Sequence, residues 1–239
     1  MLFSTLSTAV ASLALFTGSV SAVPTPNTAV YKPAKDLSRL AKLFPQSDLP
    51  SPTDGQVLKY VALGLGTQNY TCLTGDENAV PGTTGALATL YDIGTSLNYD
   101  PIAKWKIGSI SALALSLSVR PQQLDLNLRS QGFEHMIGHH FFNGSTPTFS
   151  LDQLAQPYPV ARVAKVAETD PPKSACPGNQ GEGAIKWLLL TDTVGISQGG
   201  INTVYRVETA GGNKSATCKG KKATFEVAYA AQYWIFGPK

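Results

Sequence analysis

From residue 56 onward, apolar and polar residues alternate in short runs that are separated by glycine and proline. A period of two is typical of strands that bury one face. The pattern predicts strands at 56–63, 68–73, 85–93, 134–142, 148–151, 161–168, 185–191, 203–209 and 224–229, with a last run at 233–236. We interpret Gly64-Leu65-Gly66 as a bulge or bend and residues 68–73 as the continuation of the first strand, which gives eight or nine strands in all.

Two segments depart from this period. Leu37, Leu40, Ala41 and Phe44 are spaced as on one face of a helix, and Pro45 follows as a stop signal. Residues 109–129 alternate like a strand, but their alanine and leucine content favours a helix, so we predict a helix there.

The fold class that follows is mainly β, an antiparallel β-sandwich or barrel of about 8–9 short strands with one or two short helices. The composition agrees, because 22 glycines, 16 prolines and only 15% charged residues in 239 suit short elements joined by many turns. Regular strand–helix alternation is absent, which disfavours a parallel α/β sheet. We predict a signal peptide at 1–22, a Pro-rich tail with a short helix at 23–55, and a single β domain at 56–239.

The N-terminal segment predicts export. Residues 1–22 carry no charged side chain, contain an apolar run at 9–16, and end in small residues that predict cleavage after Ala22. No other apolar segment is long enough to span a membrane. We therefore expect a soluble, secreted, extracellular protein.

Sequons and cysteines fit that location. Asn69, Asn143 and Asn213 each begin an Asn-x-Ser/Thr sequon and are predicted glycosylation sites. Three cysteines allow one disulfide in an oxidising compartment, and all three pairings are open. We favour Cys72 with Cys218 and keep Cys176 as the alternative partner, because it lies in a Pro/Gly-rich stretch.

Charge and motifs exclude several function classes. The net charge is +3 with scattered basic residues, so a nucleic-acid partner is not expected. The sequence lacks the Gly-x-Ser-x-Gly elbow of serine hydrolases and a dinucleotide-binding glycine pattern. Tyrosines and tryptophans on the predicted strands suit a β core, and an alternative set could line a barrel mouth and stack on a sugar or flat ligand.

All three histidines fall within residues 134–140. His135 and His139 share a face, and with His140 they could bind a divalent metal, either zinc or copper, at an open coordination position. The spacing is not His-Glu-x-x-His, however, and glycines flank the segment. The simpler interpretation is structural or solvated histidines and no cofactor.

Several phrases occur together in a fixed order: residues 61–72 (VALGLGTQNYTC), 90–92 (LYD), 138–142 (GHHFF), 186–190 (KWLLL), 204–212 (VYRVETAGG) and 227–234 (VAYAAQYW). With them the chain resembles a family of small secreted fungal proteins, with bacterial relatives, whose function is unknown. The resemblance implies secretion, an all-β domain and no assigned reaction. The label malate dehydrogenase that often accompanies this family does not fit, because that enzyme needs a dinucleotide fold and two lobes.

Among the positions that recur in this family, Gln68, Asp92, His139 and Arg206 are the polar ones and are the candidate catalytic or binding residues. Our first hypothesis is a non-catalytic extracellular or wall-associated protein that binds a small ligand or glycan in the barrel mouth and acts at a cell wall or on a host. The alternative is a secreted enzyme, metal-dependent through His135, His139 and His140, or acid–base through Asp92 and His139.

Overall fold

The computed structural model describes residues 30–73 and 75–239, so the predicted signal peptide and the cleavage site at Ala22 lie outside the described residues. Within them the chain forms nine strands and four helices. The strands are β1 Gln56–Thr71, β2 Gly82–Asp92, β3 Met136–Asn143, β4 Thr146–Ser150, β5 Val160–Arg162, β6 Ala164–Thr169, β7 Trp187–Thr191, β8 Thr203–Gly211 and β9 Thr224–Pro238. The helices are α1 Ser38–Ala41, α2 Gly94–Tyr99, α3 Ala103–Leu117 and α4 Pro121–Gln131.

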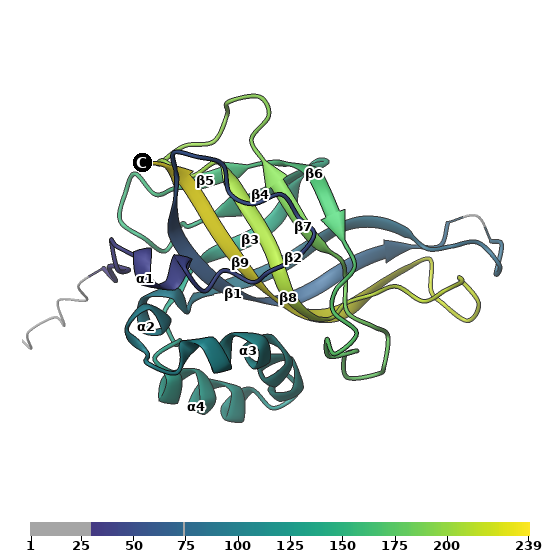
Figure 1. Ribbon diagram of the computed structural model, residues 1–239. Helices are drawn as coiled ribbons and strands as arrows, with labels where there is room; N and C mark the ends of the chain where they lie inside the picture. Colours follow the sequence, from purple (N-terminus) through teal and green to yellow (C-terminus); the bar gives the residue numbers. More distant parts are fainter. Residues whose placement is uncertain (1–29, 74) are drawn as a thin grey trace, which may run out of the picture.

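All nine strands belong to one sheet in the order β5-β4-β3-β2-β1-β9-β8-β7-β6, and every neighbouring pair is antiparallel. The edge strands β5 and β6 are consecutive in the chain, with only Val163 between them. The sheet therefore curls round until its two edges meet at this corner, and the result is a nearly closed barrel (Figure 1). The predicted mainly β, antiparallel class is confirmed, in its barrel form.

The barrel has a core on each side of its wall. Inside it, alternate residues such as Leu90, Phe149 and Ile235 pack together. Outside it, α2 and α3 cover β1, β8 and β9, and α4 packs against α3, as Figure 1 shows below the barrel. Because both faces of β9 are covered, nearly every residue from Tyr229 to Gly237 is buried, whereas a strand with one wet face would alternate.

The helices differ from the prediction in number. The expected helix at 109–129 is two helices, α3 and α4, because the chain turns at 118–120 and Pro121 starts a new helix. Helix α2 was missed, since its sequence GTSLNY carries weak helix formers and begins with glycine. The predicted N-terminal helix is present but short, and its Leu37 and Leu40 are buried against the barrel.

The strands also differ in their breaks. Gly64 and Gly66 are not at a bend, because β1 runs unbroken through them and its register shifts fall at Leu58/Tyr60 and Asn69/Tyr70. A side chain at Gly64 would overlap the ring of Tyr233 inside the barrel. The runs at 224–229 and 233–236 are one strand, β9, whereas the run at 161–168 is two strands at opposite edges of the sheet.

The segment before β1 is also part of the fold. Tyr205 donates a hydrogen bond to the Pro50 carbonyl (2.8 Å), and Leu49 is buried. The described end of the predicted tail is held in the same way, because the Tyr31 hydroxyl donates to Asp92 (2.8 Å).

Candidate functional site

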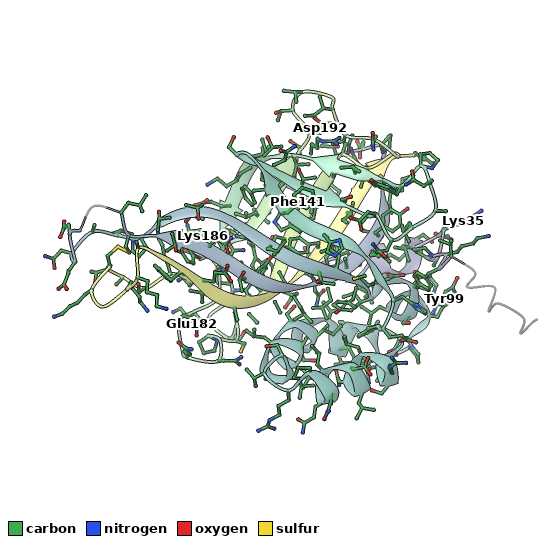
Figure 2. All side chains as sticks on the ribbon, turned by 180° about the vertical axis from the view of Figure 1, so that it is seen from behind. Lys35, Tyr99, Phe141, Glu182, Lys186 and Asp192 are labelled. Carbon is green, nitrogen blue, oxygen red and sulfur yellow. A yellow bond between two sulfur atoms is a disulfide. The ribbon has the colours of Figure 1, made fainter. Side chains whose placement is uncertain are left out.

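A cavity of about 720 Å³ lies inside the barrel. Residues of all nine strands line it, including those of the edge strands β5 and β6. It therefore reaches the seam at which the sheet does not close. Lys186, which lines it, lies toward the end from which the two long hairpins extend, as seen from behind in Figure 2. The volume is within the range of small-molecule sites, about 300–1,000 Å³.

Strand alternation directs a set of polar and aromatic side chains into this cavity. Gln68 and Tyr70 are two apart on β1, and His140 and Phe142 are two apart on β3. Arg206 of β8 is paired in register with Tyr233 of the next strand, so both side chains point to the same face. These residues, far apart in the sequence, form one lining.

One wall of the cavity is aromatic. The His140 ring stacks on Phe149, with ring centroids 4.1 Å apart and planes 9° apart. Tyr233 packs against both rings, at 5.5 Å from His140 and 4.9 Å from Phe149. Its hydroxyl lies 2.7 Å from that of Tyr229, in a fully buried pair. Phe149 and Tyr233 have no exposed area and His140 is only 4% exposed, so these rings pack mainly on one another. The half-buried side chains of Phe142 and Leu188 supply the apolar surface that stays open to the cavity.

His140 is held as a neutral ring. Its Nδ1 lies 3.0 Å from the Thr148 carbonyl oxygen, which can only accept, so Nδ1 carries the proton. Burial lowers the pKa of His140 to about 4 against the partial opposition of that hydrogen bond, and the charge of Arg206 lowers it further. At neutral pH the other ring nitrogen, Nε2, is therefore a hydrogen-bond acceptor.

Arg206 supplies positive charge among the aromatic residues. Its Nε and Nη2 donate to the Lys186 carbonyl at 3.2 and 3.0 Å, and no carboxylate pairs with it within the described residues. Burial raises the pKa of Tyr70 to about 12 and that of Tyr229, and Arg206 opposes both shifts. Its charge thus acts on the interior of the barrel.

Gln68 presents an unpartnered donor. The residue is only 5% exposed, and its Nε2 makes no hydrogen bond of good geometry in the described part of the chain. The amide is close enough to the Tyr229 hydroxyl to favour the ionised form of that tyrosine. A buried unsatisfied donor costs about 1–3 kcal/mol, so its presence needs an explanation.

The lining carries an excess of positive charge. It contains five cationic side chains, those of Arg162, Lys165, Lys186, Arg206 and Lys214, and one carboxylate, Glu168. Glu168 is bound to Lys165 (2.6 Å) and Lys186 (3.0 Å). The other three cations contact only backbone carbonyls among the described residues.

The four polar candidates from the sequence separate into two groups. Gln68 and Arg206 share the cavity. Asp92 instead caps α2, accepting the backbone N–H groups of Gly94 (2.8 Å) and Thr95 (3.2 Å), and it also accepts the Tyr31 hydroxyl. His139 points to the outer face, where its Nδ1 is 3.2 Å from Asp152. Asp92 and His139 therefore do not form an acid–base pair with the cavity residues.

The three histidines lie in three different environments. His135 stacks on Tyr31 (3.8 Å between centroids), His139 is beside Asp152, and His140 is inside the barrel. In residues 30–73 and 75–239, no three His, Cys, Asp or Glu side chains gather closely enough to hold a metal ion. The predicted grouping of His135, His139 and His140 as one metal site is therefore corrected. Strand alternation sends His139 and His140 to opposite faces, and His135 lies before β3 begins, where it stacks on Tyr31.

The predicted disulfide is present. Cys72 and Cys218 are bonded and join the β1–β2 and β8–β9 hairpins, and Cys176 is free. Of the sequon asparagines, Asn143 and Asn213 are exposed and Asn69 is half-buried; glycosylation stays a prediction. Asn213 lies on the lining of the cavity, so a glycan there would stand at its mouth.

Sequence reasoning missed the aromatic wall and the cationic lining. The inward positions of β3, His140 and Phe142, were visible as an i, i+2 pair, but their stacking partner Phe149 and the facing Arg206 come from other strands. The register that brings them together depends on pairing across the barrel, which a single sequence does not reveal.

Comparison with known proteins adds the family. No helix in the described residues combines the length and apolar character needed to cross a membrane. No curated protein and no solved structure matched the chain. A family model described as "Protein of unknown function (DUF3455)" matched residues 52–237, which include strands β1 to β8, nearly all of β9, and helices α2, α3 and α4. The chain therefore belongs to the DUF3455 family of proteins of unknown function.

Proposed function

We propose that this protein is a secreted, non-catalytic binding protein that holds one small ligand inside its barrel. The observation that carries the proposal is the cavity of about 720 Å³, with mainly apolar walls and a few inward polar groups. That combination is typical of small-molecule binding sites. A mainly apolar cavity of this size, open to solvent at one side, favours a compact ligand over an extended glycan chain.

Secretion is the second part of the proposal. The uncharged apolar N-terminus ending at Ala22 supports it, and so does the Cys72–Cys218 disulfide, because such bonds persist in oxidising compartments. The resemblance to secreted fungal proteins suggests a place at the cell wall or against a host. In that setting the protein would carry or sequester a ligand in the medium.

The test uses a neutral fluorescent probe, N-phenyl-1-naphthylamine, and a variant with a filled cavity. Leu188 is half-buried and lines the cavity, so Leu188→Trp adds bulk inside the barrel. Leu126→Trp is the matched control, because Leu126 is exposed on α4. We expect saturable fluorescence enhancement for the wild type and the control, and at least a tenfold weaker affinity for Leu188→Trp. Equal affinity in all three proteins would contradict cavity binding.

A further inference from the structure

The cavity contains more hydrogen-bond donors than acceptors. Arg206 and Arg162 are cations without a carboxylate partner in the described residues, and Gln68 Nε2 is a buried donor without an acceptor. The fixed acceptors on the lining are few: Glu168 is already shared by two lysines, and His140 offers one ring nitrogen. A ligand that accepts hydrogen bonds and carries negative charge would pair with these donors and cations.

Two of these donors lie around the same pair of tyrosines. Arg206 is in register with Tyr233 and acts electrostatically on both Tyr229 and Tyr233. Gln68 acts on Tyr229 as well, and a side chain at Gly212 would contact both Gln68 and Tyr229. Gln68 therefore lies beside Tyr229 and Arg206 beside Tyr233, two tyrosines whose hydroxyls meet, and both donors line the same cavity.

The remainder of the wall is apolar. The half-buried side chains of Phe142 on β3 and Leu188 on β7 offer a ligand apolar surface, and the buried stack of His140 and Phe149 lies beneath them. A small inorganic anion would leave these surfaces wet, whereas an apolar body would bury them. The site thus combines a place for a charge with a place for a ring or hydrocarbon.

We infer that the ligand is a small organic acid with an apolar body, whose carboxylate is bound by Arg206 and Gln68 and whose body packs on the half-buried side chains of Phe142 and Leu188. This inference rests on the proposed function and specifies the chemical class of its ligand. It also explains Gln68, because a donor that is left unsatisfied in the free protein gains its acceptor when the acid binds.

The test compares two isosteric compounds by titration calorimetry at pH 7 on the full mature chain. The first is 2-naphthoate, which is anionic, and the second is 2-naphthamide, which is neutral. We expect 2-naphthoate to bind at least tenfold more tightly, in line with the strength of hydrogen bonds to charged groups. Arg206→Gln should remove that preference, whereas Arg129→Gln, which changes an exposed arginine of α4, should keep it.

A second variant guards against a trivial loss of folding. Gln68→Met removes a donor that has no partner in the free protein, so its thermal midpoint should equal or exceed that of the wild type. Its affinity for 2-naphthoate should nevertheless fall about tenfold. A stable Gln68→Met protein with unchanged affinity would overturn the assignment of this residue.

The outcomes separate the two proposals. If 2-naphthamide binds as tightly as 2-naphthoate, or if Arg206→Gln keeps the preference, the inference about an acid is wrong and the binding function stands. If neither compound binds and the neutral probe N-phenyl-1-naphthylamine fails as well, the proposed function itself is wrong.

Discussion

Between pH 7.5 and 4.5, acid should destabilise this protein mainly through His140. The folded protein holds this ring fully buried with a pKa of about 4, against about 6.5 for the same ring in an unfolded chain. The unfolded state therefore takes up the proton first as the pH falls. Stability is highest above pH 6.5 and is lost progressively down to about pH 4, because each step of protonation favours unfolding.

The size of the effect follows from the shift. A lowering of about 2.5 pKa units corresponds to about 3 kcal/mol, and most of it should be lost by pH 4.5. That amount is a large fraction of the stability of a typical domain, about 5–15 kcal/mol. The protein should thus be markedly easier to unfold at pH 4.5 than at pH 7.5.

Urea unfolding, followed by the fluorescence of the buried tryptophans, measures this at a series of pH values. His140→Phe keeps a ring to stack on Phe149 and removes the titrating group. At pH 7.5 this variant should be about 1–2 kcal/mol less stable, since the Thr148 carbonyl loses its donor. Between pH 7.5 and 4.5 its curve should be flatter than that of the wild type by about 3 kcal/mol.

The matched control is His139→Gln, which removes a histidine from the outer face of the same strand. It should keep the steep wild-type dependence. If His140→Phe retains the wild-type slope, the ring does not titrate inside the barrel in the way described, and the reasoning is refuted.

Three further predictions concern stability and binding. Replacing both Cys72 and Cys218 by serine removes a disulfide that links residues 146 apart in the sequence. The free energy of unfolding, measured by urea unfolding, should fall by about 3 kcal/mol, and an unchanged urea midpoint would contradict this. Asp92→Ala removes the cap of α2 and should cost about 2 kcal/mol in the same assay, with probe affinity unchanged because the residue is outside the cavity lining. Gly64→Val places a side chain against the ring of Tyr233. It should destabilise the barrel by about 2 kcal/mol and weaken probe binding at least tenfold. Wild-type behaviour in both assays would show that the Tyr233 ring can move aside without cost.

The sequence predicts the strands well where one face is buried and the other is polar. The prediction fails where both faces of a strand are covered, because buried and exposed residues then no longer alternate. From the sequence alone, Gly64 and Gly66 suggest a bend. In the barrel they are instead positions where a ring or a neighbouring strand approaches the backbone closely. Helix α2 forms because Asp92, two residues before it, caps it and because the barrel covers it, and the second contact is not local to its sequence.

The site was only half accessible to sequence reasoning. The family resemblance pointed to Gln68 and Arg206, which do share the cavity, and equally to Asp92 and His139, which do not. Their roles separate only when strand direction and register are known. A capping carboxylate and a cavity residue look alike as isolated polar positions, because the distinction lies in which face of the barrel each side chain meets.

The most direct test of the account is a crystal structure of the protein with 6-bromo-2-naphthoate, located by the anomalous signal of its bromine. We expect a bromine peak inside the barrel, against the side chains of Phe142 and Leu188, with the carboxylate toward Arg206 and Gln68. A peak on the outer surface of the helices, or an interior that stays without ligand at a saturating concentration, would contradict the claim that the barrel cavity is the binding site.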